Sequence, residues 1–96
     1  MLILITYDVT TSTKEGRKRL NLIAKKCVRH GQRVQNSVFE CYLDTSILRK
    51  FQAELEAIIN PEEDSLRIYN LGNKYMQKVT HIGIKPSIPI EGDLVV

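Results

Sequence analysis

The first third of the chain changes from a strand pattern to a helix pattern. Residues 2–9 are apolar or β-branched at their start on both alternating faces, as in a central strand that is covered on both sides. Ser12 and Glu15 have the spacing of a capping box, and apolar residues then recur at helical intervals as far as His30 and Gly31. A strand followed by a helix is therefore predicted here.

The middle of the chain predicts a strand region and a second helix. In residues 33–43 the apolar positions change parity, which indicates a bulge near residues 35–37. Helical spacing returns in the apolar residues between 47 and 59, and Asn60 followed by Pro61 ends that run.

Two more strands are expected at residues 65–71 and 78–84, with a glycine-asparagine turn after the first of them. The simplest order is then β-α-β-α-β-β. If residues 33–43 bend at their bulge into two short strands, the order becomes βαββαβ. We expect this second arrangement, an α+β ferredoxin-like sandwich in which two helices cover one face of an antiparallel sheet. It would form a single domain over residues 1–96.

The carboxyl-terminal tail, residues 85–96, contains two prolines that prevent it from continuing a strand, yet it ends in Leu94-Val95-Val96. We expect this apolar end to form an extra strand at a sheet edge, either its own or that of a partner. The second arrangement would lock a homodimer. A chain this short buries only about 60 to 65% of its unfolded surface, so dimerisation would add needed stability.

Composition excludes several classes of protein. The chain is 43% hydrophobic and 26% charged, as is typical of a globular domain. Its first apolar run is too short for a signal peptide, and no run approaches the length of a membrane span, so a cytoplasmic protein without a membrane partner is expected. Cys27 and Cys41 have neither metal-site nor disulfide-framework spacing, and we expect both to be core thiols.

Charge is unevenly distributed along the chain. Residues 14–29 hold seven basic side chains and one acid, a local charge of +6, while residues 44–64 hold six acids and two basic side chains, a local charge of −4. Lys18 lies in the basic segment. This polarity suggests a surface that faces a polyanion, and a solvated helix face is the alternative explanation.

Asp8 is the most informative candidate for chemistry. An acid at the end of an apolar strand must be hydrated, paired or bound to a metal, or else it caps the following turn. Magnesium sites that act on phosphates need one or two carboxylates together with water and substrate oxygens, and a two-fold dimer would supply a second acid. His30 and His81 have no partners that would complete a catalytic triad, so both are expected to be structural.

Several segments together resemble a known family. They are Tyr7-Asp8, Arg17 with Arg19, and the run from Arg33 to Cys41. In order and spacing these segments are similar to the small CRISPR-associated nuclease of the spacer-acquisition machinery, the partner of the CRISPR integrase. Residues 64–73 and 81–87 resemble its type I-C branch, so the similarity extends through essentially the whole chain.

The resemblance implies a ferredoxin-like homodimer whose carboxyl-terminal strands pair across subunits. It also implies that Asp8 from both protomers faces one cleft and binds Mg²⁺ or Mn²⁺. The family positions near nucleic acid or needed for activity correspond to Arg17, Arg19, Arg33 and Phe39, and the basic helix adds Lys18. Tyr7 is expected beside Asp8 as a catalytic residue.

Three hypotheses follow. In the first, the paired Asp8 carboxylates make the protein a metal-dependent phosphodiesterase acting on duplex DNA or single-stranded RNA, and Tyr7 and Phe39 help to shape the cleft. In the second, the dimer is a scaffold that holds duplex DNA between integrase subunits, as the polarised charge favours. In the third, the protein is a toxin-type ribonuclease of the same fold, which the genomic neighbourhood would distinguish.

Overall fold

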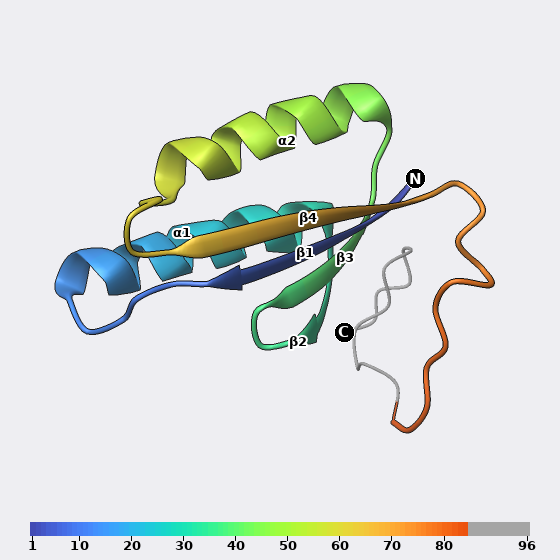
Figure 1. Cartoon of the computed structure of the whole chain (residues 1–96), viewed down its shortest axis with the longest axis horizontal. Helices are drawn as coiled ribbons and strands as arrows, with labels where there is room; N and C mark the ends of the chain where they lie inside the picture. The colour runs from blue at the N-terminus through green and yellow to red at the C-terminus, as the bar shows by residue number, and fades with distance from the viewer. Residues whose placement is uncertain (85–96) are drawn as a thin grey trace.

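The computed structural model describes residues 1–84, which form four strands and two helices (Figure 1). In chain order these are β1 (Leu2–Asp8), α1 (Lys14–His30), β2 (Gly31–Gln35), β3 (Val38–Tyr42), α2 (Thr45–Ile58) and β4 (Ser65–Gly72). The observed order is βαββαβ. The ferredoxin-like α+β fold expected from the sequence is confirmed.

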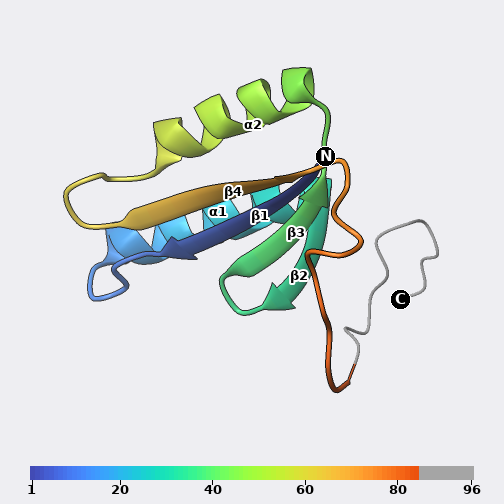
Figure 2. The same cartoon turned by 45° about the vertical axis from the view of Figure 1, so that its right-hand side comes forward.

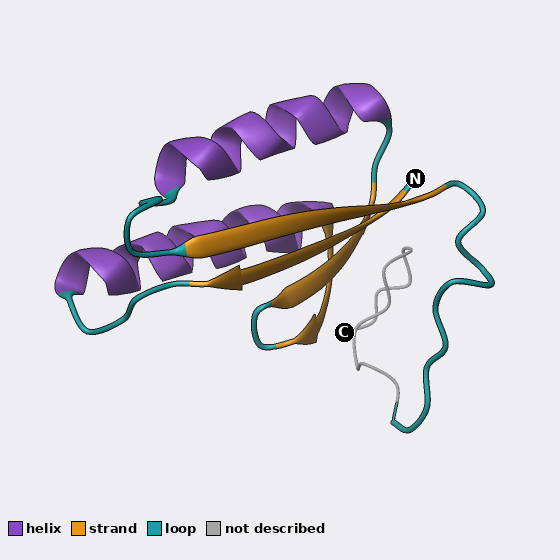
Figure 3. Cartoon of the chain, viewed as in Figure 1, coloured by secondary structure: helices purple, strands orange, loops and turns teal. Residues whose placement is uncertain are grey.

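The four strands form one antiparallel sheet in the order β2-β3-β1-β4. Both helices lie on the same face of this sheet, and within residues 1–84 the other face carries no helix (Figures 2 and 3). β1 therefore lies inside the sheet, between β3 and β4, whereas β2 and β4 form its edges. β1 pairs with β3 only as far as Thr6, so its last residue, Asp8, is paired with β4 alone.

The core fills the space between the helices and the sheet. The side chains of Ile3 and Ile5 on β1 are completely buried there. Their neighbours in the core come from the other elements: Ile23, Cys27, Phe39, Cys41, Phe51 and Leu55. Cys27 and Cys41 are confirmed as buried free thiols, and burial raises the pKa of each to about 12.

The segment expected to bend at its bulge into two short strands does so, and forms a tight hairpin. β2 and β3 are separated only by Asn36 and Ser37, and their pairing shifts register between Arg33 and Gln35. The change of parity in the sequence thus marks a turn together with a local irregularity. This division produces the ferredoxin-like order rather than the simpler one.

Two expectations differ from the structure. Thr13, not Ser12, caps α1, because its hydroxyl accepts a hydrogen bond from Gly16 N at 3.0 Å. The strand expected at residues 78–84 is absent, since the described residues after Gly72 contain turns and irregular backbone. The tail at 85–96 and its predicted strand lie outside the described residues.

Neither described helix is long and apolar enough to cross a lipid bilayer.

Candidate active site at the end of strand β1

Asp8 is the last residue of β1 and its side chain is exposed. Successive side chains of a strand point to opposite faces, and the buried residues Ile5 and Tyr7 face the helices. Asp8 therefore lies on the helix-free face. Ser65, the first residue of β4, is directly opposite it in the strand pair.

Polar residues of β4 continue this face beside Asp8. Thr6 pairs with Arg67, and Arg67 Nη1 donates to the hydroxyl of Tyr69 at 3.1 Å. The site residues predicted from the sequence do not include Ser65, Arg67 or Tyr69. Their alternation with two apolar residues over 65–69 is the signal that could have found them, because it places all three on one face.

Tyr7 does not share a surface with Asp8. Its ring is 6% exposed and lies 6.2 Å from the ring of Phe39 at an interplanar angle of 19°. Its hydroxyl is buried without a hydrogen bond of good geometry in the described residues; burial raises its pKa, and the nearby guanidinium of Arg33 partly offsets this rise. Tyr7 therefore lies in the core, on the face of the sheet opposite to Asp8, and its predicted catalytic role stays a prediction.

Phe39 also lies in the core, and its predicted contact with nucleic acid stays a prediction. Its side chain is 0% exposed within the described chain. The guanidinium carbon of Arg33 lies 5.0 Å from the centre of its ring, a cation-π contact. Arg33 itself is exposed, so its predicted contact with nucleic acid remains a proposal.

The two arginines predicted in α1 both reach neighbouring loops. Arg17 is exposed and its Nη1 donates to the carbonyl of Thr11 at 3.1 Å. Arg19 is largely covered, with a side chain only 16% exposed, and its Nε lies 2.7 Å from Asp64 Oδ2. Its Nη2 also lies 3.4 Å from Glu63 Oε1.

Arg19 is therefore satisfied by acids of its own chain. Its guanidinium, together with backbone N–H groups of Asn60 and Thr10, lowers the pKa of Asp64. The predicted contact between Arg19 and nucleic acid stays a prediction, and it would compete with these bonds.

Lys18 belongs to a basic stripe on the outer face of α1, formed by Lys14, Lys18, Lys25 and Arg29. Their spacings of four and seven residues place them on one side of the helix over about 22 Å. All four are exposed, and none has an ion pair within residues 1–84. The stripe matches the +6 segment of the sequence.

The donor set at Asp8 fits a magnesium site that is shared. Residues 1–84 contain no group of three or more His, Cys, Asp or Glu side chains that could hold a metal ion. Mg²⁺ commonly binds through one or two carboxylates and takes its other ligands from water and substrate phosphates. A single exposed carboxylate per chain fits that pattern when two copies contribute.

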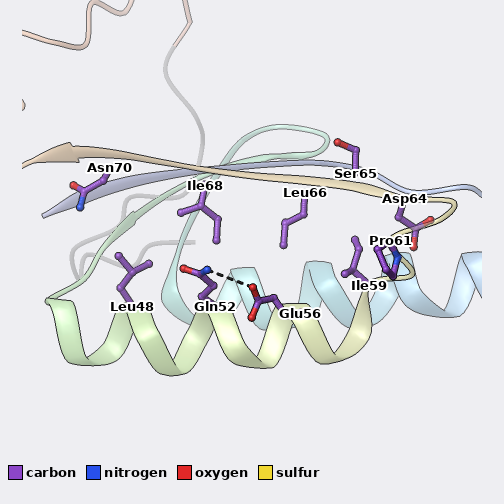
Figure 4. Close-up of a pocket in the computed structure, with 10 residues that line it drawn as sticks. All are labelled: Leu48, Gln52, Glu56, Ile59, Pro61, Asp64, Ser65, Leu66, Ile68 and Asn70. Atoms are coloured by element: carbon purple, nitrogen blue, oxygen red, sulfur yellow. Dashed lines mark hydrogen bonds between the residues drawn. The ribbon is translucent and has the colours of Figure 1, made fainter.

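A groove lies on the helix side of β4 (Figure 4). This groove of about 700 Å³ runs between α2 and the sheet edge, and Leu48, Ile59, Leu66 and Ile68 give it an apolar lining. Asp64 is at one end, but its carboxylate is already hydrogen-bonded. The groove therefore offers an apolar surface beside a free strand edge rather than a catalytic centre.

The chain is similar to several known proteins. A family model described as CRISPR associated protein Cas2 matches residues 1–79. The chain is 58% identical over 95 residues to the CRISPR-associated endonuclease Cas2 of Halalkalibacterium halodurans, with 99% of each chain covered. It is 49% identical over 94 residues to the CRISPR-associated endoribonuclease Cas2 3 of Rhodospirillum rubrum, covering 98% of this chain and 99% of the relative.

A solved structure shares the fold. The crystal structure of Streptococcus pyogenes Cas2 at pH 6.5 has a TM-score of 0.75 and 47% sequence identity to this chain, and the match covers 86% of this chain and 100% of the other.

Proposed function

This chain belongs to the Cas2 family, and on that premise we propose that it is a metal-dependent endonuclease of CRISPR adaptation that works as a homodimer. The observation that carries the proposal is Asp8, an exposed carboxylate at the end of an interior strand on the helix-free face. Two relatives are named endonuclease and endoribonuclease. Duplex DNA and single-stranded RNA are accordingly both taken as candidate substrates.

The helix-free face supports the homodimer. It carries Leu4 and Val38, which are only partly covered, and Tyr69, which is 41% exposed. After β4, Ile82 and Ile84 are at least 90% exposed. Apolar surface of this kind is usually covered by a partner, and a second copy placed against this face would bring the two Asp8 side chains together.

In this account the two Asp8 carboxylates hold Mg²⁺ or Mn²⁺. The bound ion would supply activation of water and stabilisation of charge at the phosphate. Ser65 and Arg67 lie beside Asp8 on the same face, so their hydroxyl and guanidinium groups would orient the phosphate backbone.

The basic stripe on α1 favours a second role, the scaffold that holds duplex DNA for the CRISPR integrase. Unpaired lysines along one helix face contact phosphates without reading sequence. The scaffold and nuclease roles are compatible, because the basic stripe does not include Asp8. The family match favours either CRISPR role over a toxin-type ribonuclease of the same fold.

The tail at residues 85–96 is proposed to pair with β4 of the partner. β4 is an edge strand in the described chain, and the apolar groove runs beside it. An added strand would satisfy the free backbone groups of this edge.

The nuclease proposal is tested by comparing the wild type with Asp8→Asn in Mg²⁺, on duplex DNA and on single-stranded RNA. We expect the rate on the true substrate to fall by at least about 100-fold, because removing a metal ligand removes its charge stabilisation. Glu62→Gln is the matched control, since Glu62 is also an exposed acid but lies in the α2–β4 loop. Equal cleavage by the wild type and Asp8→Asn would remove Asp8 from the mechanism.

The scaffold role is tested by spacer acquisition in cells. If Asp8→Ala supports acquisition while charge reversal of Lys18, Lys25 and Arg29 abolishes it, the scaffold role is the one needed in the cell. The opposite result would discard that role.

A further inference from the structure

Asp64 is a buried acid with an unusually full set of hydrogen bonds. Its side chain is 0% exposed. Oδ2 accepts from Arg19 Nε at 2.7 Å and from Asn60 N at 3.0 Å, while Oδ1 accepts from Thr10 N at 3.1 Å and from Arg19 Nη2 at 3.3 Å. A buried carboxylate is tolerated only when it is bonded in this way. All of its capacity is used inside the chain, so Asp64 is not available as a metal ligand.

The bonds of Asp64 converge on the loop that follows Asp8. Thr10, two residues after Asp8, donates from its N–H to Asp64 and from its hydroxyl to the carbonyl of Glu63 at 2.8 Å. On its other side, the first turn of α1 approaches so closely that a Cβ on Gly16 would lie 1.8 Å from the carbonyl oxygen of Thr10. Thr10 is therefore fixed between two elements.

Asp64 is also next in sequence to the residue that pairs with Asp8 across the sheet. Its neighbour Ser65 pairs with Asp8 in the β1–β4 ladder. One carboxylate thus ties both the residue facing Asp8 and the loop after it to the same guanidinium of α1. The backbone of Asp8 has little freedom to turn while these bonds hold.

From this geometry we propose that Asp64 and Arg19 are positioning residues, which fix the direction of the Asp8 carboxylate by clamping Thr10. The proposal rests on the proposed nuclease function of Asp8. It assigns Arg19 a role in activity that requires no contact with nucleic acid. Catalytic groups must be held within a fraction of an ångström of their working geometry, and a misplacement of about 1 Å can lower a rate about 100-fold.

The test compares Asp64→Asn with the wild type well below the unfolding temperature. Asparagine has the size of aspartate but places an NH₂ group against N–H donors, so at least one bond is lost. We expect kcat to fall about tenfold or more while the KM for the oligonucleotide stays within twofold. Protection of the Thr10 amide from hydrogen exchange should fall at least tenfold, while that of the Ile5 amide in the core of β1 stays within twofold.

Glu54→Gln is the matched control. It removes the exposed contact between Lys26 and Glu54, 3.7 Å long, which joins α1 to α2. Its kcat and its Thr10 protection should both stay within twofold of the wild type. If kcat and Thr10 protection fall equally in Glu54→Gln and Asp64→Asn, any weakening of the helix layer changes Asp8. That result would overturn the specific role of Asp64.

Arg19→Lys is the second variant, to be used if Asp64→Asn does not fold. Lysine keeps the charge but loses the two-point contact with Asp64, so kcat should fall several-fold with KM unchanged. Wild-type kcat in either folded variant overturns the positioning role. Failure of the nuclease proposal is recognised separately, because in that case Asp8→Asn itself would leave the rate unchanged.

Discussion

Tyr7 and Asp8 are neighbours in sequence but lie on opposite faces of the sheet. The alternation of a strand separates them, so Tyr7 enters the core and Asp8 faces outward. Phe39 is also buried, and Arg19 is largely covered and paired with Asp64. At the residue scale the site therefore depends on which face each side chain occupies.

Tyr7→Phe tests the core role of Tyr7. The hydroxyl is buried without a hydrogen bond of good geometry in the described residues, and an unsatisfied polar group of this kind costs about 1 to 3 kcal/mol. We expect the variant to be at least as stable as the wild type in urea unfolding, with kcat within twofold. A tenfold lower kcat in the folded variant would support the predicted catalytic role of Tyr7.

The buried thiols predict a loss of stability at alkaline pH. The pKa of Cys27 and of Cys41 is raised from 9.0 to about 12. Above pH 9 the unfolded thiols lose their protons while the folded ones retain them, so the folded state becomes less stable as pH rises towards 12. Each thiol contributes a slope of about 1.4 kcal/mol per pH unit in the free energy of unfolding.

Urea unfolding between pH 8 and pH 10.5 measures this slope. Cys27→Ala should flatten it by about one thiol's share, about 1.4 kcal/mol per pH unit, whatever its effect on stability at neutral pH. An unchanged slope in the variant would contradict the raised pKa of Cys27.

At the scale of elements, the sequence predicts both helices and three of the strand regions well. Apolar spacing runs to Val28 and stops at His30-Gly31, and His30 is indeed the last residue of α1. The hairpin between β2 and β3 was less evident, because a two-residue turn and a bulge both change the parity of apolar positions. Ser12 and Thr13 are similar caps, so spacing alone could not decide between them.

The site was harder to predict than the fold. Asp8 stands out because it interrupts an apolar strand, whereas Ser65 and Arg67 become its neighbours only through the pairing of β1 with β4. The link between Arg19 and Asp64 joins residues 45 positions apart and leaves no periodic signal in the sequence. At residues 78–84 the sequence predicted a strand that does not form. The β-branched residues there form no strand within the described chain.

The basic stripe of α1 gives a prediction for the whole helix. If it contacts duplex phosphates, Lys18→Gln and Lys25→Gln together should weaken duplex binding equally for unrelated sequences. The slope of log affinity against log salt should become shallower by about 0.9 for each phosphate contact that is lost. Titration by fluorescence anisotropy at several salt concentrations measures both effects.

Lys50→Gln on α2 is the control for this titration. Lys50 is equally exposed but lies within the acidic segment of the chain, so its loss should leave the salt slope unchanged. An equal change in the slope for Lys50→Gln and for the stripe variants would mean that net charge, rather than the stripe, determines binding.

Residues 1–84 form a sheet with one face covered by helices and one face that carries no helix of this described part, called the open face (Figure 3). The open face carries both the partly covered apolar residues and Asp8, so dimerisation and catalysis are proposed to use the same surface. A small domain gains stability from such an interface, and an active site with one carboxylate per chain gains its second ligand.

Val38→Lys tests this arrangement in solution. Val38 lies opposite Thr6 on the open face, and a lysine there would place a charge in the interface. We expect its mass by light scattering to shift towards the monomer, with the circular dichroism of the fold retained. Val28→Lys on the exposed side of α1, where Val28 is 59% exposed, should remain a dimer. A dimeric Val38→Lys would place the interface elsewhere.

Anomalous diffraction from crystals of the protein soaked in Mn²⁺ tests the shared site most directly. We predict one manganese peak about 2.1 Å from a carboxylate oxygen of Asp8 in each of two copies of the chain. The account is contradicted if the two Asp8 side chains lie on distant surfaces of the assembly, or if manganese binds elsewhere while Asp8 remains free.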